Sequence, residues 1–184
     1  MNKYLTWIEI DLNAIRHNFR VLRKLAGTAK ILTVIKADAY GHGMLPIAKL
    51  LIQEKVDFIG LSNLTEGIAL RKAGIRTPVL LFETTLAEQA KDIIDYELTP
   101  TVCTYELAAA LNRYAHKCKR VVDIHVKVDT GMGRLGLWYQ ETPAFMKQIG
   151  RLRNLRVQGI YTHFPAADID RSFTRKQIQQ FIML

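Results

Sequence analysis

Short apolar runs alternate with amphipathic stretches along almost the whole chain. The apolar runs are rich in β-branched residues and are bounded by turn residues, which is typical of buried strands. The stretches between them carry apolar residues at helical spacing, and the first one, over 11–26, is followed by Gly27 as a stop signal. We predict strands over residues 31–37, 57–62, 78–82, 98–102, 121–128 and 157–162.

Six strands that alternate with helices predict βαβ units and a parallel sheet. Successive strands mostly begin 20 to 26 residues apart, which is typical of a (β/α)8 TIM barrel. We therefore predict an α/β fold of this type with about six βα units, and an active site at the C-terminal ends of its strands. Six units are too few to close an eight-stranded barrel. The last helical stretch also ends at Leu184 without a stop signal, so we expect a truncated chain.

Composition narrows the possible functions. The 184 residues are 49% hydrophobic, which is enough for a globular core. The net charge of +9 is spread along the chain without a nucleic-acid-binding motif, so we expect no nucleic-acid partner. No apolar run is long enough for a membrane span, and the start of the chain has no signal-peptide core. Cys103 and Cys118 fit neither a zinc site nor a disulfide framework. We expect a cytoplasmic protein without a metal or a membrane partner.

One lysine stands out at the end of the first predicted strand. Lys36 interrupts an apolar run directly before a turn that contains Gly41 and Gly43. Burial lowers the pKa of a lysine and makes its amine nucleophilic enough to form a Schiff base. The alternative is an ordinary strand-end lysine that extends to water. Tyr40 can add a hydroxyl to the same site, and the two glycines permit close approach of a ligand.

Three segments of the chain resemble motifs of the alanine racemase family. VIKADAYGHG at 34–43 is similar to its pyridoxal-phosphate lysine motif, VKVDTGMGRLG at 126–136 to its second motif, and GIYTHF at 159–164 to its third. They occur in the order of the family, and the resemblance runs from Trp7 to the last residue. It implies that residues 11–184 are a partial pyridoxal-phosphate-binding barrel. Residues 1–10 would be a leading strand that joins a missing C-terminal β domain.

The resemblance also implies roles for single residues. Lys36 would carry pyridoxal 5'-phosphate as a Schiff base and act as the base on the D side of the substrate. Tyr40 would bind the phosphate, and Arg134 would contact the phenolic oxygen of the cofactor and the substrate carboxylate. His163 would belong to the cofactor-binding set as a relay of hydrogen bonds. The alternatives are packing for Tyr40, a surface loop for Arg134 and a core position for His163.

Lys127 lies inside the fifth predicted strand, on the same face as His125 and Asp129 because side chains alternate along a strand. In many alanine racemases the matching lysine is carbamylated, which turns a buried cation into an anion that orients the arginine. The alternative is a salt bridge between Lys127 and Asp129.

The implied activity is the interconversion of L- and D-alanine, which supplies D-alanine for peptidoglycan, in a homodimer. The base for the L side would be a tyrosine from the second domain of the partner subunit, so we expect this chain alone to be inactive. Three alternatives remain: a single-domain pyridoxal-phosphate carrier, a related barrel amino-acid decarboxylase, or the unfolded product of a degenerate gene. The motifs around Tyr40 and Arg134 favour the racemase over the carrier.

Overall fold

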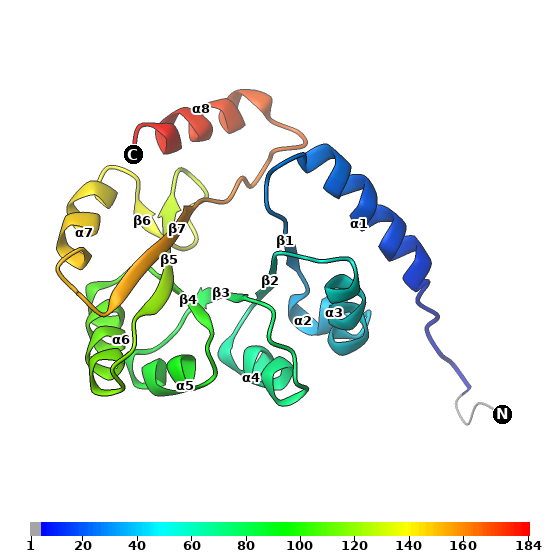
Figure 1. Cartoon of the computed structure of the whole chain (residues 1–184). Coiled ribbons are helices and arrows are strands. Elements are labelled where there is room, and N and C mark those ends of the chain that lie inside the picture. Colours follow the sequence, from blue (N-terminus) through cyan, green and yellow to red (C-terminus); the bar gives the residue numbers. More distant parts are fainter. Residues whose placement is uncertain (1–4) are drawn as a thin grey trace.

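The computed structural model describes residues 5–184 and shows seven parallel strands in one sheet. The helices lie in an arc on the outside of the strands (Figure 1). The strands are β1 Leu32–Val34, β2 Phe58–Leu61, β3 Val79–Thr84, β4 Thr99–Val102, β5 Val122–Asp129, β6 Leu137–Trp138 and β7 Leu155–Tyr161. The helices are α1 Leu12–Ala26, α2 Lys36–Tyr40, α3 Met44–Gln53, α4 Leu64–Lys72, η1 Ala87–Gln89, α5 Ala90–Asp95, α6 Tyr105–Lys117, α7 Thr142–Ile149 and α8 Arg171–Ile182.

The strands follow one another in space as they do along the chain. The order is β1-β2-β3-β4-β5, and both β6 and β7 pair with β5. All C-terminal strand ends therefore meet at one edge, as in a (β/α) barrel. Within residues 5–184, β1 and β7 each have one neighbouring strand, so the barrel is open between them. The predicted partial barrel is confirmed, while the two-residue strand β6 was missed.

The core lies between the sheet and the arc of helices. Leu61, Leu81, Leu111 and Ile124 are completely buried there, as the apolar patterning predicts. Aromatic rings line the inner face of the sheet instead. The His125 ring lies 5.9 Å from that of Phe58 and 6.4 Å from that of Tyr161, measured between centroids, and the Tyr161 ring lies 6.0 Å from that of Phe82.

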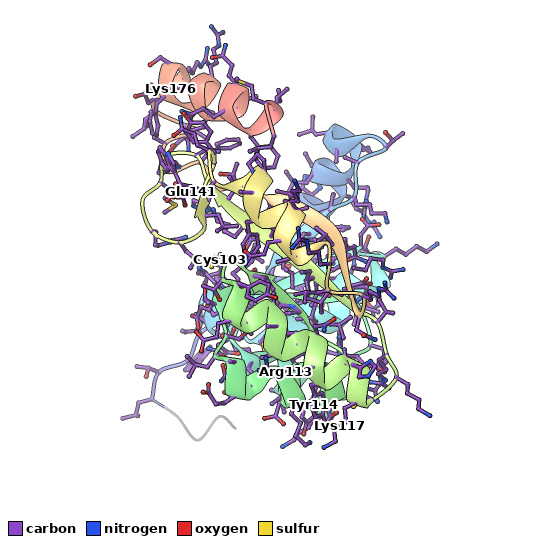
Figure 2. All side chains as sticks on the ribbon, turned by 90° about the vertical axis from the view of Figure 1, so that its left-hand side faces the viewer. Cys103, Arg113, Tyr114, Lys117, Glu141 and Lys176 are labelled. Atoms are coloured by element: carbon purple, nitrogen blue, oxygen red, sulfur yellow. The ribbon has the colours of Figure 1, made fainter. Side chains whose placement is uncertain are left out.

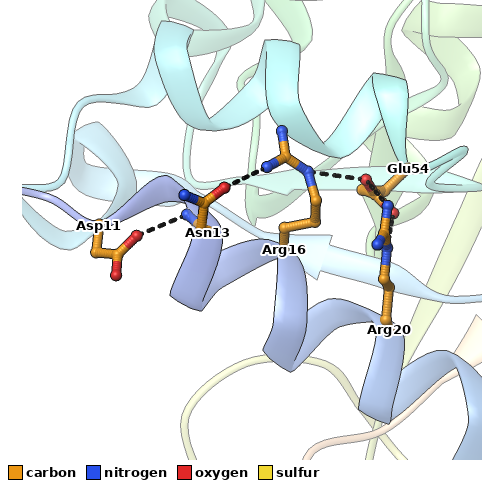
Figure 3. A network of polar contacts seen from close by, with 5 residues as sticks. All are labelled: Asp11, Asn13, Arg16, Arg20 and Glu54. Atoms are coloured by element: carbon orange, nitrogen blue, oxygen red, sulfur yellow. Dashed lines mark hydrogen bonds and ion pairs between the residues drawn. The ribbon is translucent and has the colours of Figure 1, made fainter.

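Polar contacts join the first helix to the end of α3 (Figure 3). Asp11 caps α1 by accepting the Asn13 amide at 2.8 Å. Arg16 and Arg20 on α1 both donate to the Glu54 carboxylate just after α3, at 3.0 and 2.7 Å. Exposed ion pairs stabilise a fold little, typically by up to about 1 kcal/mol, so this network mainly sets how α1 lies on α3.

The segment before α1 pairs with no strand in the described part of the chain. Residues 5–10 have no regular secondary structure, and residues 1–4 of the expected leading strand lie outside the described residues. Between residues 5 and 184, no helix is both long and apolar enough to cross a bilayer.

Candidate active site

A cavity of about 300 Å³ opens at the C-terminal ends of the strands. All five residues predicted for the site reach it, from the ends of β1, β5 and β7. It is lined by Val34, Lys36, Tyr40, Phe82, Lys127, Arg134, Leu135, Tyr161, Thr162 and His163.

A second hollow, of about 340 Å³, lies at the opposite ends of the strands. Its lining has two carboxylates, Glu97 and Asp123, and one cation, Arg120, which pairs with Glu97 at 3.5 Å. The cavity at the C-terminal ends has no carboxylate in its lining but three cationic side chains, Lys36, Lys127 and Arg134. The charge balance therefore favours this cavity as the binding site of an anionic ligand.

Lys36 stands at the start of a turn with an unusual backbone. The strand before it ends at Val34 and not at Ala37 as predicted, and Ala37, Asp38, Ala39 and Tyr40 have φ angles between 51° and 56°. The left-handed conformation costs an L-residue about 1–2 kcal/mol, so four in succession need support from their surroundings. Such strain concentrates at functional sites.

The turn is held by hydrogen bonds to two carboxylates. The Asp38 carboxylate accepts the Met44 amide at 2.6 Å, and the Glu66 carboxylate accepts the Ala37 amide at 2.6 Å. Asn63 caps α4 by accepting the Glu66 amide at 3.0 Å. The Glu66 side chain contributes nothing to that cap, because it is directed to the turn after Lys36.

Arg134 follows β5 on a loop that Asp129 organises. The two oxygens of the buried Asp129 carboxylate accept the amides of Gly131 and Gly133, each at 2.8 Å. Both glycines have positive φ angles, 132° and 72°, which other residues adopt only with strain. A β-carbon on Gly131 would lie 2.9 Å from the Phe173 ring of α8, so this loop also needs glycine for space.

Lys127 is a buried amine without an acidic partner. It is 5% exposed, and its Nζ donates to the Val128 carbonyl at 2.9 Å and lies 5.5 Å from the centroid of the Tyr161 ring. Among residues 5–184 it forms no ion pair with Asp129, so the salt-bridge alternative is wrong. Burial lowers the pKa of Lys127, and the nearby Asp129 charge opposes this only in part.

Tyr161 is a residue of the site that the sequence analysis missed. It is the register partner of Lys127, and its hydroxyl contacts Thr101 Oγ1 at 2.7 Å. Burial raises the pKa of Tyr161 to about 12, so the phenol stays neutral. The alternation that placed Lys127 on the inner face also places Tyr161 and His163 together, which is the signal that pointed to it.

Tyr40 and His163 lie at the rim of the cavity. Tyr40 is 60% exposed, so packing does not explain its position. His163 is also exposed, and the core position considered for it is wrong. Partial desolvation and the charges of Arg134, Lys127 and Lys36 lower the pKa of His163 and favour its neutral form. Its backbone carbonyl accepts from the buried Gln177 of α8 at 3.2 Å.

Comparison with known proteins gives consistent matches over almost the whole chain. Residues 10–184 match the family "Alanine racemase, N-terminal domain". An alanine racemase of Carboxydothermus hydrogenoformans is 44% identical over 95% of this chain and 48% of its own length. One from Halothermothrix orenii is 40% identical over 98% of this chain and 49% of its own length. The chain thus spans about half the length of the curated relatives it matches.

Solved structures give the same result. An alanine racemase from Clostridium difficile superposes with a TM-score of 0.93 at 37% identity, covering 98% of this chain and 48% of that one. The same enzyme in complex with cycloserine superposes with a TM-score of 0.95 at 36% identity, over 99% of this chain and 51% of that one.

Proposed function

Because the chain belongs to the alanine racemase family, we propose that it forms the pyridoxal-phosphate-binding half of an enzyme that interconverts L- and D-alanine. The observation that carries the proposal is the convergence of Lys36, Lys127 and Arg134 on one cavity whose lining has no carboxylate. We further propose that residues 11–184 are the cofactor barrel and that residues 1–10 lead into a second domain. The family resemblance supports a cytoplasmic homodimer that makes D-alanine for peptidoglycan.

The lining of the cavity fits pyridoxal 5'-phosphate. Phe82 and Tyr161 offer aromatic surface to a flat ring, and the cationic side chains favour a phosphate and a carboxylate. Lys36 would hold the cofactor covalently, and the Tyr40 hydroxyl would bind its phosphate. When bound, the cofactor supplies the electron sink that makes the α-proton of an amino acid removable.

Other steps of the proposed reaction, proton transfer and binding of the substrate carboxylate, would fall to side chains that line the cavity. Lys36 Nζ would accept and return the α-proton on the D side of alanine, and the Arg134 guanidinium would bind the substrate carboxylate, for which its planar fork is suited. His163, whose pKa is lowered by partial desolvation and by the surrounding cations, would relay hydrogen bonds at the rim. Racemisation needs a second base on the opposite side, for which we propose a tyrosine from the second domain of the partner subunit.

Lys127 has the properties that carbamylation requires. Its lowered pKa makes the neutral amine more accessible than in an exposed lysine, and the nitrogen of that amine forms a bond to the carbon of CO2 and releases a proton. The product is an anion close to Arg134, which would orient the guanidinium in place of an acidic side chain. We therefore propose Lys127 as a carbamylated residue.

The function is tested by joining this chain to the second half of the Carboxydothermus hydrogenoformans enzyme, here called the joined chain. With pyridoxal phosphate and L-alanine in deuterated water, the joined chain should form D-alanine and exchange the α-proton. Lys36→Ala should abolish both, while Lys30→Ala, a matched change outside the cavity, should leave them unchanged.

The 184-residue chain by itself should racemise at least about 10²–10⁴-fold more slowly, because general-base catalysis is worth that much. A joined chain that folds and binds the cofactor but forms no D-alanine would favour the carrier over the racemase.

A further inference from the structure

Glu66 connects two neighbouring βα units at the edge of the cavity. One oxygen of its carboxylate accepts the Ala37 amide at 2.6 Å, directly after Lys36. The other accepts the Ser62 amide at 2.8 Å, directly after β2. Both bonds are charge-assisted, which makes them among the stronger hydrogen bonds in a protein. Glu66 itself does not line the cavity, so it acts only through the backbone.

These bonds continue the pairing of two strands beyond the point where the sheet ends. The β1–β2 register reaches Val34 and Gly60, and the Ile35 amide still donates to the Gly60 carbonyl at 3.0 Å. From Ala37 the chain turns into its left-handed course and leaves the sheet. The Ala37 amide would lose its partner there, and the Glu66 carboxylate supplies one.

A purely local role for Glu66 does not explain this geometry. A capping glutamate at this position of a helix bonds the amide of the N-cap residue, which is Asn63 here. Glu66 bonds Ser62 and Ala37 instead, 4 and 29 residues away along the chain. Among the side-chain hydrogen bonds of residues 5–184, it makes the only one that reaches residues 36–41 from another βα unit.

We propose that Glu66 is a positioning residue, which holds the left-handed turn over residues 37–40 and thereby directs Lys36 into the cavity. The reactive role of Lys36 rests on the function proposed above, whereas the support of the turn by Glu66 does not. Removing the carboxylate frees the Ala37 amide and lets the strained turn relax toward ordinary φ values. The side chain of Lys36 then loses its fixed direction.

Glu66→Gln tests this, because glutamine has the same shape but can accept only one of the two amides without opposing donors. The matched control is Asp57→Asn. Asp57 accepts the Ile31 amide at 2.8 Å at the other end of the β1 segment, far from the cavity. Both variants remove the charge of a carboxylate that accepts an amide of the same segment. Asp57 also pairs with Arg23 at 2.7 Å, so the control removes an ion pair that the test variant does not.

The first measurement is amide hydrogen exchange by NMR on the full chain without cofactor. A hydrogen bond to a charged group corresponds to roughly ten- to hundredfold in an equilibrium constant. In Glu66→Gln the Ala37 amide faces either the new NH2 group or an uncharged oxygen, so its exchange should speed up by up to about that factor while Ile31 stays unchanged. Asp57→Asn should do the reverse. Unchanged exchange at Ala37 in Glu66→Gln would overturn the proposal.

The second measurement is the rate at which pyridoxal phosphate, trapped with borohydride, attaches to Lys36. Glu66→Gln should slow it by roughly tenfold or more, while Asp57→Asn should match the unchanged protein. Faster exchange at Ala37 with unchanged labelling of Lys36 would overturn the positioning role. If the unchanged protein itself is not labelled at Lys36, the proposed function fails, and the exchange data still decide whether Glu66 holds the turn.

A second variant covers the case in which Glu66→Gln does not fold. Glycine adopts a φ of 51° without strain, so Ala37→Gly should remove part of the strain that Glu66 offsets. The double variant Glu66→Gln/Ala37→Gly should then show a cooperative melt where Glu66→Gln shows none, and a higher melting temperature where both fold. A double variant that also fails to fold, or that melts no higher, would contradict the proposal.

Discussion

Replacing Asp129 by asparagine should disorder the loop that carries Arg134. Asp129 is 8% exposed, and its two oxygens each accept one glycine amide at 2.8 Å. Asparagine keeps one acceptor and turns an NH2 group toward the second amide. The loss is one charge-assisted hydrogen bond, and the glycine amide that faces the NH2 group is left without a protein partner. Because hydrogen bonds to charged groups contribute about 1.5–3 kcal/mol, we expect the free energy of unfolding to fall by about 2–4 kcal/mol.

Urea denaturation of the Asp129→Asn protein measures this loss, with Asp170→Asn as the control. Asp170 makes the same kind of bond, from its carboxylate to the Phe173 amide at 2.9 Å, but at the exposed N-cap of α8. Asparagine is as good an N-cap as aspartate, so the control should change stability by less than about 0.5 kcal/mol. Equal losses in the two variants would refute the role of Asp129 as the organiser of the Arg134 loop.

Four further predictions concern Arg71, Lys127 and Gly131. Arg71 is 6% exposed and donates to four backbone carbonyls, so Arg71→Met should lower the free energy of unfolding, measured in urea, by about 3–5 kcal/mol. Arg113→Met, on the exposed face of α6 (Figure 2), is the control and should lower it by less than about 0.5 kcal/mol. Because the pKa of Lys127 is lowered in the folded chain, the unfolded chain binds more protons than the folded one at pH values just below the ordinary pKa of 10.5. The free energy of unfolding of the uncarbamylated protein should therefore rise with pH in that window, and Lys127→Met should flatten the rise. With 13C-labelled bicarbonate, a carbamate signal should appear in the NMR spectrum and vanish in Lys127→Met; a signal that persists would place the carbamate elsewhere. Gly131→Ala should lower the melting temperature, since its β-carbon would meet the Phe173 ring at 2.9 Å, and an unchanged melting temperature would contradict this contact.

The periodicity of the sequence predicted the fold well because apolar strands and amphipathic helices leave strong patterns. All six predicted strands occur in the structure within a few residues of their expected limits. The missed strand β6 has two residues, one of them exposed, and follows Gly136, so it leaves almost no pattern. Short strands of this kind form because a neighbouring strand is already in place, which a local pattern does not record.

The site was predicted as a set of residues but not as a geometry. Lys36, Arg134 and His163 follow strand ends, so the barrel topology alone brings them to one edge. The left-handed turn after Lys36 was not predictable, since alanine and tyrosine do not favour positive φ, and the support from Glu66 comes from another part of the chain.

The covalent attachment of pyridoxal phosphate to Lys36 is the part of the proposed function that a single measurement can decide. The protein is loaded with the cofactor, reduced with borohydride, digested, and the modified lysine is identified by mass spectrometry. The cavity contains two lysines, Lys36 and Lys127, and several others lie outside it, among them Lys30 and Lys49. We predict a single pyridoxyl group, on Lys36. A label on Lys127, or on Lys30 or Lys49, would contradict it.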